Sequence, residues 1–309
     1  MEARCEMLIE ALKQSIPKKQ IIPFAPMREY TTLKLGGPAD VLVSVSSVEE
    51  ITAALSAARA QDVPVTVIGN GSNLLVRDGG IRGLVIHVGD GFSAVSAPVP
   101  LPDGRYAITA QGGATLTKLS NAAADNALAG LEFACGIPGT VGGAVFMNAG
   151  AYGGEIKDVA VKTLYLDAAG ELREAVGEAH DFSYRHSRFQ PGEIVLSCDF
   201  LLQPGDENEI QAKMSELAAK RKASQPLELP SAGSTFKRPA GGYAAALIDQ
   251  AGLKGLTVGG AQVSTKHAGF VVNIGGASCA DVLALMEKIK EAVLAASGIE
   301  LEPEVRIVK

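Results

Sequence analysis

The sequence predicts a mixed α+β protein with more than one domain. The chain has 309 residues, enough for two or three domains with a sizeable core. Near the N-terminus a strand–helix–strand pattern stands before a stretch of alternating residues that is typical of antiparallel strands. A smaller unit that mixes helices and strands ends the chain. The 35 glycines exceed the usual share and are clustered, which points to backbone that approaches other groups closely.

Composition and charge argue against several classes of protein. The net charge of -6 gives no electrostatic footprint for nucleic acid, and no apolar run approaches the ~18 residues of a membrane span. Residues 1–17 combine acidic and apolar positions as an amphipathic helix does, which a secretory signal would not. The four cysteines are scattered, and His180 and His186 lack metal-ligand spacing with them. We therefore expect no metal, reduced thiols and a cytoplasmic location; nothing in the sequence indicates an oligomeric state.

The first part of the chain reads as strand, helix and strand. Residues 41–45 alternate as in a strand. Ser47 followed by Glu50 forms a capping-box pattern, which opens a helix. A second strand over residues 63–69 runs straight into the glycine loop GNGSN.

The middle of the chain predicts further strands and a helix before a domain boundary. The boundary is expected near residues 203–209, where Asp206 caps a charged helix that runs through Lys222. Ahead of it we expect an antiparallel region over residues 81–113 with turns at GDG and PDG, a helix over 115–133, and strands at 161–166 and 193–202. Beyond it we expect a short helix over 244–252, a strand around 270–273, a long helix from Ser278 to Gly298, and a terminal strand over 300–308.

Two glycine-rich segments are candidates for ligand binding. Residues 69–73 follow a strand, and successive N–H groups in such a loop can converge on an anion. Residues 136–154 hold seven glycines, whose entropy cost implies close approach of the backbone to something. That partner is either another element in a tight turn or a long diphosphate ligand, and two such segments favour the ligand. No G-x-G-x-x-G occurs, which argues against a Rossmann site.

Three short segments carry candidate catalytic side chains. YRHSRF contains Arg185, AGSTFKRP contains Ser234, and EPEVR contains Glu304 and Arg306, which alternation along a strand would place on one face. Each of them alone is more often a solvated or paired group than a catalytic one. Ser234 does not stand in a G-x-S-x-G elbow, so it does not read as a hydrolase nucleophile.

Seven segments, in order and over nearly the whole chain, resemble the UDP-N-acetylenolpyruvoylglucosamine reductase (MurB) family. One glycine loop would be weak evidence, whereas seven collinear segments are strong evidence. The segments are TTLKLGGPAD, GNGSNLLV, GLEFACGIPGTVGGAVFMNAGAYGGE, YRHSRF, AGSTFKRP, GGAQVSTKHAGFVVN and LEPEVR.

The resemblance implies a fold and its domains. It implies two FAD-binding subdomains of the vanillyl-alcohol-oxidase (PCMH) type and a C-terminal α/β substrate-binding domain. Subdomain 1 is expected over residues 1–82, joined by the C-terminal strand 300–309; subdomain 2 over 83–203; and the substrate-binding domain over 204–299. Some members carry a tyrosine in an extended loop after the YR segment. Residues 197–222 contain no tyrosine, so this chain resembles the shorter branch.

The resemblance also implies roles for individual residues. The catalytic positions that match are Arg185, Ser234 and Glu304, and Lys237 and Arg238 are expected to bind substrate. FAD is the implied bound cofactor and NADPH the co-substrate. The residues expected to bind FAD are Gly69, Asn70, Gly71, Ser72, Asn73, Gly139, Thr140, Gly142, Gly143, Asn148, Gly150, Ala151 and Tyr152.

The implied reaction reduces the enolpyruvyl ether of UDP-N-acetylglucosamine to UDP-N-acetylmuramate, a step in peptidoglycan precursor synthesis. Hydride is expected from reduced FAD and the proton from Ser234, while Arg185 and Glu304 stabilise the enolate. One alternative is another FAD-dependent sugar or lactone oxidoreductase of the same flavin fold. A second is a non-catalytic protein that uses the glycine loops only to bind a nucleotide.

Overall fold

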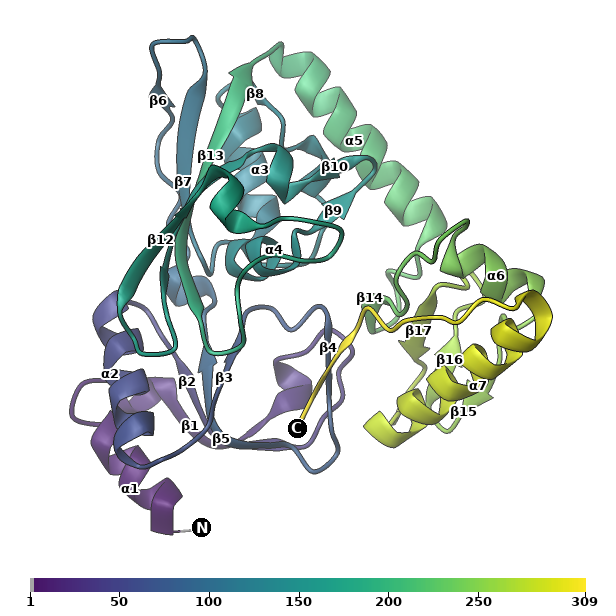
Figure 1. Ribbon diagram of the computed structural model, residues 1–309, viewed down its shortest axis with the longest axis horizontal. Helices are drawn as coiled ribbons and strands as arrows, with labels where there is room; N and C mark the ends of the chain where they lie inside the picture. Colours follow the sequence, from purple (N-terminus) through teal and green to yellow (C-terminus); the bar gives the residue numbers. More distant parts are fainter. Residues whose placement is uncertain (1–2) are drawn as a thin grey trace. The chain divides into compact units, whose positions relative to one another are not determined.

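The structure is a computed structural model that describes residues 3–309, and the chain forms two compact units (Figure 1). Among the residues described, no helix is both long enough and apolar enough to span a bilayer. Unit 1 contains the described residues up to Pro23, Val41–Asn70 and Gly83–Lys220. Unit 2 contains Phe24–Asp40, Gly71–Arg82 and Arg221–Lys309.

A four-stranded sheet and two helices form the first core, most of which belongs to unit 1. The strand order is β1-β2-β5-β3, with β3 parallel to β5. Helices α1 and α2 lie side by side (Figure 1), and their apolar faces share one core with these strands. The bounds are α1 Ala3–Leu12, β1 Ile21–Pro26, β2 Pro38–Ser44, α2 Val48–Ala60, β3 Val65–Ile68 and β5 Ile81–His87. The predicted strand, helix and strand are confirmed, although β5 stands between β2 and β3 in the sheet.

The expectation that residues 81–113 are antiparallel throughout is wrong for residues 81–87. These residues form β5, which pairs in parallel with β3. Ile81, Leu84 and Ile86 are all fully buried, so β5 is apolar on both of its faces. A strand that is buried on both faces is typical of the centre of a parallel sheet, whereas an antiparallel strand with one wet face would alternate.

The predicted cap of α2 forms in a modified way. The Ser47 hydroxyl accepts a hydrogen bond from the Glu50 N–H at 3.2 Å, as the capping-box pattern predicts. The Glu50 carboxylate does not return to Ser47; it accepts from the N–H of Ser46 at 2.6 Å and from the Gln20 amide at 2.8 Å. Both Ser47 and Glu50 therefore fix the start of the helix, but the Glu50 carboxylate accepts from the N–H of Ser46, one residue before the expected donor, Ser47.

The second sheet, also in unit 1, is antiparallel, in the order β12-β11-β13-β7-β6, with β8 paired to β13. Helices α3 and α4 share its core, so they lie against this sheet. The bounds are β6 Val99–Pro100, β7 Tyr106–Gln111, α3 Leu116–Ala124, β8 Leu128–Ala129, α4 Val141–Met147, β9 Gly150–Ala151, β10 Gly154–Glu155, β11 Ala160–Leu166, β12 Leu172–Val176 and β13 Ile194–Pro204. The helix predicted over 115–133 ends at Ala124, because Ala127 takes a left-handed backbone with φ 52° and β8 follows.

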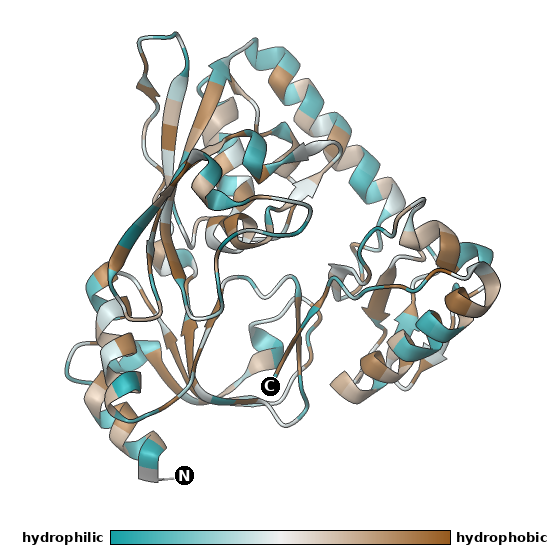
Figure 2. Ribbon diagram, in the orientation of Figure 1, coloured by the Kyte–Doolittle hydropathy of each residue, from teal (hydrophilic) through white to brown (hydrophobic). Residues whose placement is uncertain are grey.

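Helix α5 (Glu207–Ser224) follows β13 after only Gly205 and Asp206. The Asp206 carboxylate accepts a hydrogen bond from the Glu209 N–H at 3.0 Å, which confirms the predicted cap. The helix is largely hydrophilic (Figure 2) and buries Ile210, Met214 and Leu217. Two connecting residues leave no room for an extended loop between β13 and α5.

Unit 2 packs helices α6 and α7 with an antiparallel sheet in the order β14-β17-β16-β15. Helix α7 has the predicted ends: Ser278 and Asp281 form a complete capping box, and Gly298 closes the helix with φ 72°. Strand β18 runs parallel to β4. The bounds are β4 Leu74–Val76, β14 Ser231–Ser234, α6 Ala244–Gln250, β15 Thr257–Val258, β16 Ala261–Val263, β17 Phe270–Asn273, α7 Cys279–Ser297 and β18 Arg306–Val308.

Candidate functional site

The loop that follows β3 offers a run of backbone donors. Among residues 3–309, no protein group accepts a hydrogen bond from the N–H of any of the residues Gly69–Asn73. Gly71 lies in the left-handed region at φ 60°. Successive N–H groups around a left-handed residue are the donors that anion-binding loops use.

The start of this loop lies against the second glycine segment. The Asn70 side-chain amide donates to the Pro138 carbonyl at 3.2 Å. A Cβ at Gly69 would come within 2.2 Å of the Thr140 hydroxyl oxygen. Two of the segments that the sequence singled out as glycine-rich are therefore brought together.

The second glycine segment contains a short helix. Thr140 caps α4 by accepting from the Gly143 N–H at 3.4 Å, and Asn148 ends it with a left-handed φ of 40°. The β9–β10 hairpin follows, with its turn at Tyr152 and Gly153. Asn148 is fully buried; its side-chain amide donates to Ser183 O at 2.9 Å and to the Glu155 carboxylate at 3.3 Å, and its side-chain oxygen accepts from the Lys157 N–H at 2.9 Å.

Packing of the chain itself requires glycine at several positions in these two segments. A Cβ would come within 2.1 Å of the Tyr30 carbonyl oxygen at Gly71, and within 2.7 Å of the Glu155 side chain at Gly150. At Gly143, in contrast, the nearest atom to an added Cβ is the Thr140 hydroxyl oxygen at 3.6 Å. Packing against another element, the alternative that the sequence left open, thus accounts for Gly69, Gly71 and Gly150. Gly143 leaves bare helical backbone that packing does not explain.

Arg185 stands in a strained turn. Ser183 and His186 exchange two backbone hydrogen bonds of 3.1 Å each, so Tyr184 and Arg185 form the turn between them. Arg185 has a φ of 55°, which costs a non-glycine residue about 1–3 kcal/mol and persists only where the surroundings fix it. Its guanidinium lies 4.9 Å from the centre of the Tyr184 ring.

Hydrogen bonds from and to this turn fix it against the second glycine segment. The Asn148 amide donates to Ser183 O at 2.9 Å, Ser187 Oγ donates to Phe146 O at 2.7 Å, and Arg185 Nη2 donates to Gly150 O at 3.1 Å. The predicted catalytic arginine and the predicted FAD-binding residues around α4 and β9 therefore form one cluster within unit 1. We call residues 140–152 and 183–187 the Arg185 cluster.

The neighbouring Arg188 has a structural environment. Its guanidinium lies 4.7 Å from the centre of the Tyr165 ring and forms a 3.1 Å ion pair with Glu193, which is largely buried. These contacts are made to strand β11 and to the segment that leads into β13. The two arginines of YRHSRF are thus distinguished by what they contact.

Ser234 is exposed at the end of β14. Gly233 has a φ of 76°, and the pairing of β14 with β17 shifts register between Ser231 and Ser234. Such an irregularity re-aims a side chain. The next residue, Thr235, is buried; its N–H donates to Gly269 O at 2.9 Å, which fixes the backbone beside the serine.

Glu304 is held next to this strand end. The carbonyl of Thr235 accepts a hydrogen bond from the Glu304 N–H at 2.8 Å. The Asn73 side chain donates to the Glu304 carbonyl at 3.1 Å, so the first glycine loop also fixes the terminal segment. We call residues 233–238 and 302–306 the Ser234 cluster, which lies in unit 2. The expected strand over 300–308 is too long: only Arg306–Val308 form β18, so alternation does not place Glu304 and Arg306 on one face.

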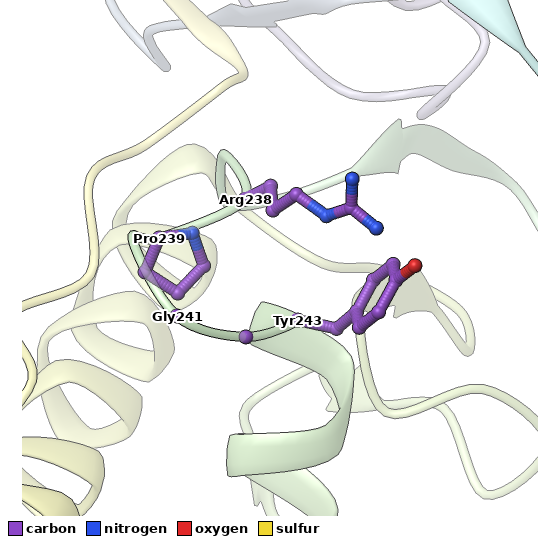
Figure 3. A pocket seen from close by; sticks show the side chains of 5 residues that line it. Arg238, Pro239, Gly241 and Tyr243 are labelled. Atoms are coloured by element: carbon purple, nitrogen blue, oxygen red, sulfur yellow. The ribbon is translucent and has the colours of Figure 1, made fainter. Parts of the chain in front are cut away.

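The two predicted substrate-binding residues already have protein partners. The Lys237 ammonium forms an ion pair with the Glu302 carboxylate, and the backbone N–H of Lys237 donates to the backbone carbonyl of Glu302 at 2.8 Å. The Arg238 guanidinium lies 3.8 Å from the centre of the Tyr243 ring (Figure 3). The sequence did not single out Thr235, Glu302 or Tyr243. Glu302 stands two residues before Glu304, and this spacing could have predicted its role. No sequence pattern around Thr235 or Tyr243 predicts theirs.

Comparison with known proteins first defines a class. Residues 39–175 match the family described as FAD binding domain, and residues 225–308 match the family described as UDP-N-acetylenolpyruvoylglucosamine reductase, C-terminal domain. A variant of Phl p 4, a glucose oxidase, is similar in fold alone: its identity is 16% and its TM-score 0.50, over 96% of this chain and 60% of that chain. The chain is thus a flavoprotein with the FAD-binding fold of the vanillyl-alcohol-oxidase type and a C-terminal α/β domain, which confirms the predicted fold class.

Similar proteins then define the family. UDP-N-acetylenolpyruvoylglucosamine reductase from Agathobacter rectalis is 50% identical over 98% of both chains, and that from Levilactobacillus brevis is 49% identical over 98% of this chain and 97% of the other. The crystal structure of the reductase (MurB) from Thermus caldophilus has 37% identity and a TM-score of 0.78, covering 94% of this chain and 98% of that chain. The chain belongs to the UDP-N-acetylenolpyruvoylglucosamine reductase family.

Proposed function

We propose that this chain reduces the enolpyruvyl ether of UDP-N-acetylglucosamine to UDP-N-acetylmuramate, with bound FAD and with NADPH as co-substrate. One observation carries the proposal: the chain belongs to the reductase family over 98% of its length, and it has Arg185, Ser234 and Glu304 at the positions that the resemblance implies are catalytic. Arg185 is fixed to the glycine segment around α4, and Ser234 and Glu304 are held together through Thr235. The product serves peptidoglycan precursor synthesis. The four cysteines, which form no disulfide, support a cytoplasmic location.

The two glycine segments fit FAD. The N–H groups of Gly69–Asn73 are donors of the kind that a diphosphate needs, and the bare backbone at Gly143 allows a ligand to approach. The proposed FAD-binding residues are those named from the sequence: Gly69, Asn70, Gly71, Ser72, Asn73, Gly139, Thr140, Gly142, Gly143, Asn148, Gly150, Ala151 and Tyr152. When bound, FAD would supply the redox chemistry, which is the transfer of a hydride from NADPH to the vinyl carbon of the substrate.

We propose the domain division that the family resemblance implies. Residues 1–82 with the terminal segment 300–309, of which Arg306–Val308 form β18, make up the first FAD subdomain, 83–203 the second, and 204–299 the substrate-binding domain. The parallel pairing of β18 with β4 supports joining the terminal strand to the first segment.

Arg185 stabilises the charge that develops during reduction. Hydride addition to the vinyl CH₂ carbon leaves negative charge on the adjacent carbon, which the substrate carboxylate shares. A guanidinium presents a planar pair of donors that matches a carboxylate, and its bond to Gly150 O orients it before the substrate arrives. Preorganised donors of this kind lower the barrier where charge appears.

Ser234 and Glu304 complete the reduction. The Ser234 hydroxyl gives its proton to the carbon next to the carboxylate, so that one hydride and one proton are added across the double bond. A serine hydroxyl is a weak acid, and its efficiency depends on placement, which the fixed backbone of Thr235 provides. The Glu304 carboxyl group is the second group, beside Arg185, that stabilises the enolate. Lys237 and Arg238 bind the phosphates of the substrate.

The activity is tested by the product. Without oxygen, the purified protein is expected to oxidise more NADPH than its bound flavin can accept only when the UDP-enolpyruvyl sugar is present, and to yield a sugar nucleotide heavier by two hydrogen atoms in the mass spectrum. Oxidation of NADPH with unchanged sugar nucleotide would show a flavoprotein that acts on another substrate. A colourless protein without flavin would favour the non-catalytic alternative.

Replacing Gly143 with alanine separates packing from cofactor binding. The added Cβ comes no closer than 3.6 Å to the Thr140 hydroxyl oxygen, and within a helix alanine is favoured over glycine by about 1 kcal/mol. We therefore expect the FAD-free protein to melt at a higher temperature than the wild type and to bind FAD more weakly. Thermal melting without cofactor and fluorescence titration with FAD measure the two effects. Equal FAD affinity in the variant would show that Gly143 does not contact the cofactor.

A further inference from the structure

The turn that carries Arg185 is held at both of its ends by buried side chains. At its start, the amide of the fully buried Asn148 donates to Ser183 O at 2.9 Å. Just after its end, the Ser187 hydroxyl donates to Phe146 O at 2.7 Å, and Ser187 is 3% exposed. Both hydrogen bonds lead to the C-terminal end of α4, so they fasten the turn to the end of one helix.

The Ser187 hydroxyl uses its proton inside the protein. A hydroxyl has one proton to donate, and here it goes to Phe146 O at a distance typical of a good O–H···O bond. Phe146 stands in the last turn of α4, where the carbonyls have no partner within the helix, so Ser187 supplies a donor for one of them. The serine therefore acts through the residues that it holds and not by contact with the substrate.

Arg185 has a backbone that relaxes unless its surroundings hold it. Its φ of 55° lies in the left-handed region, which a non-glycine residue keeps only where other contacts fix it. Its guanidinium must at the same time reach Gly150 O, to which Nη2 donates at 3.1 Å. A turn released at Ser187 can return to an ordinary φ, and the guanidinium then leaves this place. A misplacement of about 1 Å can cost about 10²-fold in rate.

We propose that Ser187 is a positioning residue for Arg185: its hydroxyl fixes the strained turn, so that the guanidinium is in place before the substrate carboxylate arrives. The inference rests on the proposed function, to which it adds a residue that touches neither substrate nor cofactor. The alternative is a serine that only stabilises the fold of unit 1. A positioning role needs the Arg185 guanidinium, whereas a stabilising role does not.

The test is a double-mutant cycle of Ser187→Ala and Arg185→Ala in the FAD-bound protein, with the two half-reactions followed separately by stopped-flow absorbance of the flavin. Ser187→Ala alone is expected to slow reoxidation by the UDP-enolpyruvyl sugar by about 10-fold or more, since it misplaces the guanidinium. In the Arg185→Ala background the same change is expected to slow it by less than about 2-fold, because no guanidinium is left to position. Reduction by NADPH should stay within about 2-fold of the wild type throughout.

Ser120→Ala is the matched control for the loss of a buried hydroxyl. Ser120 is 1% exposed, and its hydroxyl donates to Leu116 O at 2.8 Å and to Leu131 O at 3.1 Å within the core of the second sheet. Its replacement is expected to lower the melting temperature and to leave both half-reactions within about 2-fold of the wild type. If Ser187→Ala does not retain FAD, Ser187→Cys repeats the cycle, because its thiol is a weak donor of similar size; the slowing is then expected to be smaller and to depend on Arg185 in the same way.

The outcomes separate this inference from the proposed function. If Ser187→Ala slows reoxidation equally with and without the Arg185 guanidinium, or does not slow it, the inference is overturned and the proposed function stands. Slowing of both half-reactions, or loss of FAD by both Ser187 variants, would also overturn it, because the serine would then support the fold. If the sugar never reoxidises the wild-type flavin, the proposed function fails and the inference fails with it.

Discussion

Ser234→Ala is expected to slow the reoxidation of the reduced enzyme by the UDP-enolpyruvyl sugar by about 10²–10⁴-fold, the loss typical of a missing general acid. Reduction of the flavin by NADPH is expected to continue at a near-normal rate, because that half-reaction protonates no carbon. The variant should fold normally, since Ser234 is exposed and its backbone is fixed by Thr235. Stopped-flow absorbance of the flavin measures the two half-reactions separately.

A matched control for this substitution lies in the same strand. Ser231→Ala removes a hydroxyl from β14 while keeping the backbone carbonyl that accepts a hydrogen bond from Thr32 Oγ1 at 2.6 Å. Both half-reactions of Ser231→Ala are expected to match the wild type. If Ser234→Ala slows both half-reactions equally, the serine positions a group that both reactions share. If it slows neither, the proton comes from elsewhere and the assignment is wrong.

Arg185→Lys is expected to slow reoxidation by substrate by about 10²-fold or more, as for the removal of an oxyanion donor. Lysine keeps the positive charge but lacks the planar fork, so it cannot bind both carboxylate oxygens and Gly150 O in the same geometry. The amount of bound FAD per protein and the rate of reduction by NADPH should stay close to the wild type. Stopped-flow kinetics and flavin absorbance provide these values.

Arg188→Lys serves as the control, because it is expected to change the stability of the protein and not the rate of reoxidation. Arg188 contacts Tyr165 and Glu193, so its replacement is expected to lower the melting temperature and to leave the reoxidation rate of the folded fraction unchanged. If Arg185→Lys instead yields protein without FAD, or loses stability as Arg188→Lys does, Arg185 has a structural role and the catalytic assignment fails.

Local sequence signals were sufficient to predict where several helices begin or end. The ends of α7 follow from Ser278, Asp281 and Gly298, because caps act within one helical turn. The start of α5 follows from Asp206 for the same reason. The parallel pairing of β5 could not be predicted, since it depends on β3, from which it is separated by the glycine loop and β4.

The resemblance gave the candidate site residues, which stay predictions, but the contacts that fix these residues could not be predicted from the sequence. The resemblance supplied Arg185, Ser234 and Glu304, whereas the strained φ of Arg185 and the bond from Glu304 N–H to Thr235 O arise from contacts between distant segments. The glycines show why a sequence pattern alone does not separate packing from ligand binding. Gly71 and Gly143 both stand in segments that were predicted to bind a ligand; a Cβ at Gly71 would collide with the Tyr30 carbonyl oxygen, whereas a Cβ at Gly143 would lie 3.6 Å from the Thr140 hydroxyl oxygen, an ordinary contact.

The most direct test of the account is an anaerobic experiment on the purified yellow protein. NADPH is added first, until the flavin absorbance near 450 nm, roughly, is lost, and the UDP-enolpyruvyl sugar is then added without oxygen. We predict full return of the flavin absorbance, with one UDP-N-acetylmuramate formed for each flavin reoxidised. A flavin that stays reduced after the sugar is added, but is reoxidised when air is admitted, would contradict the proposed reaction.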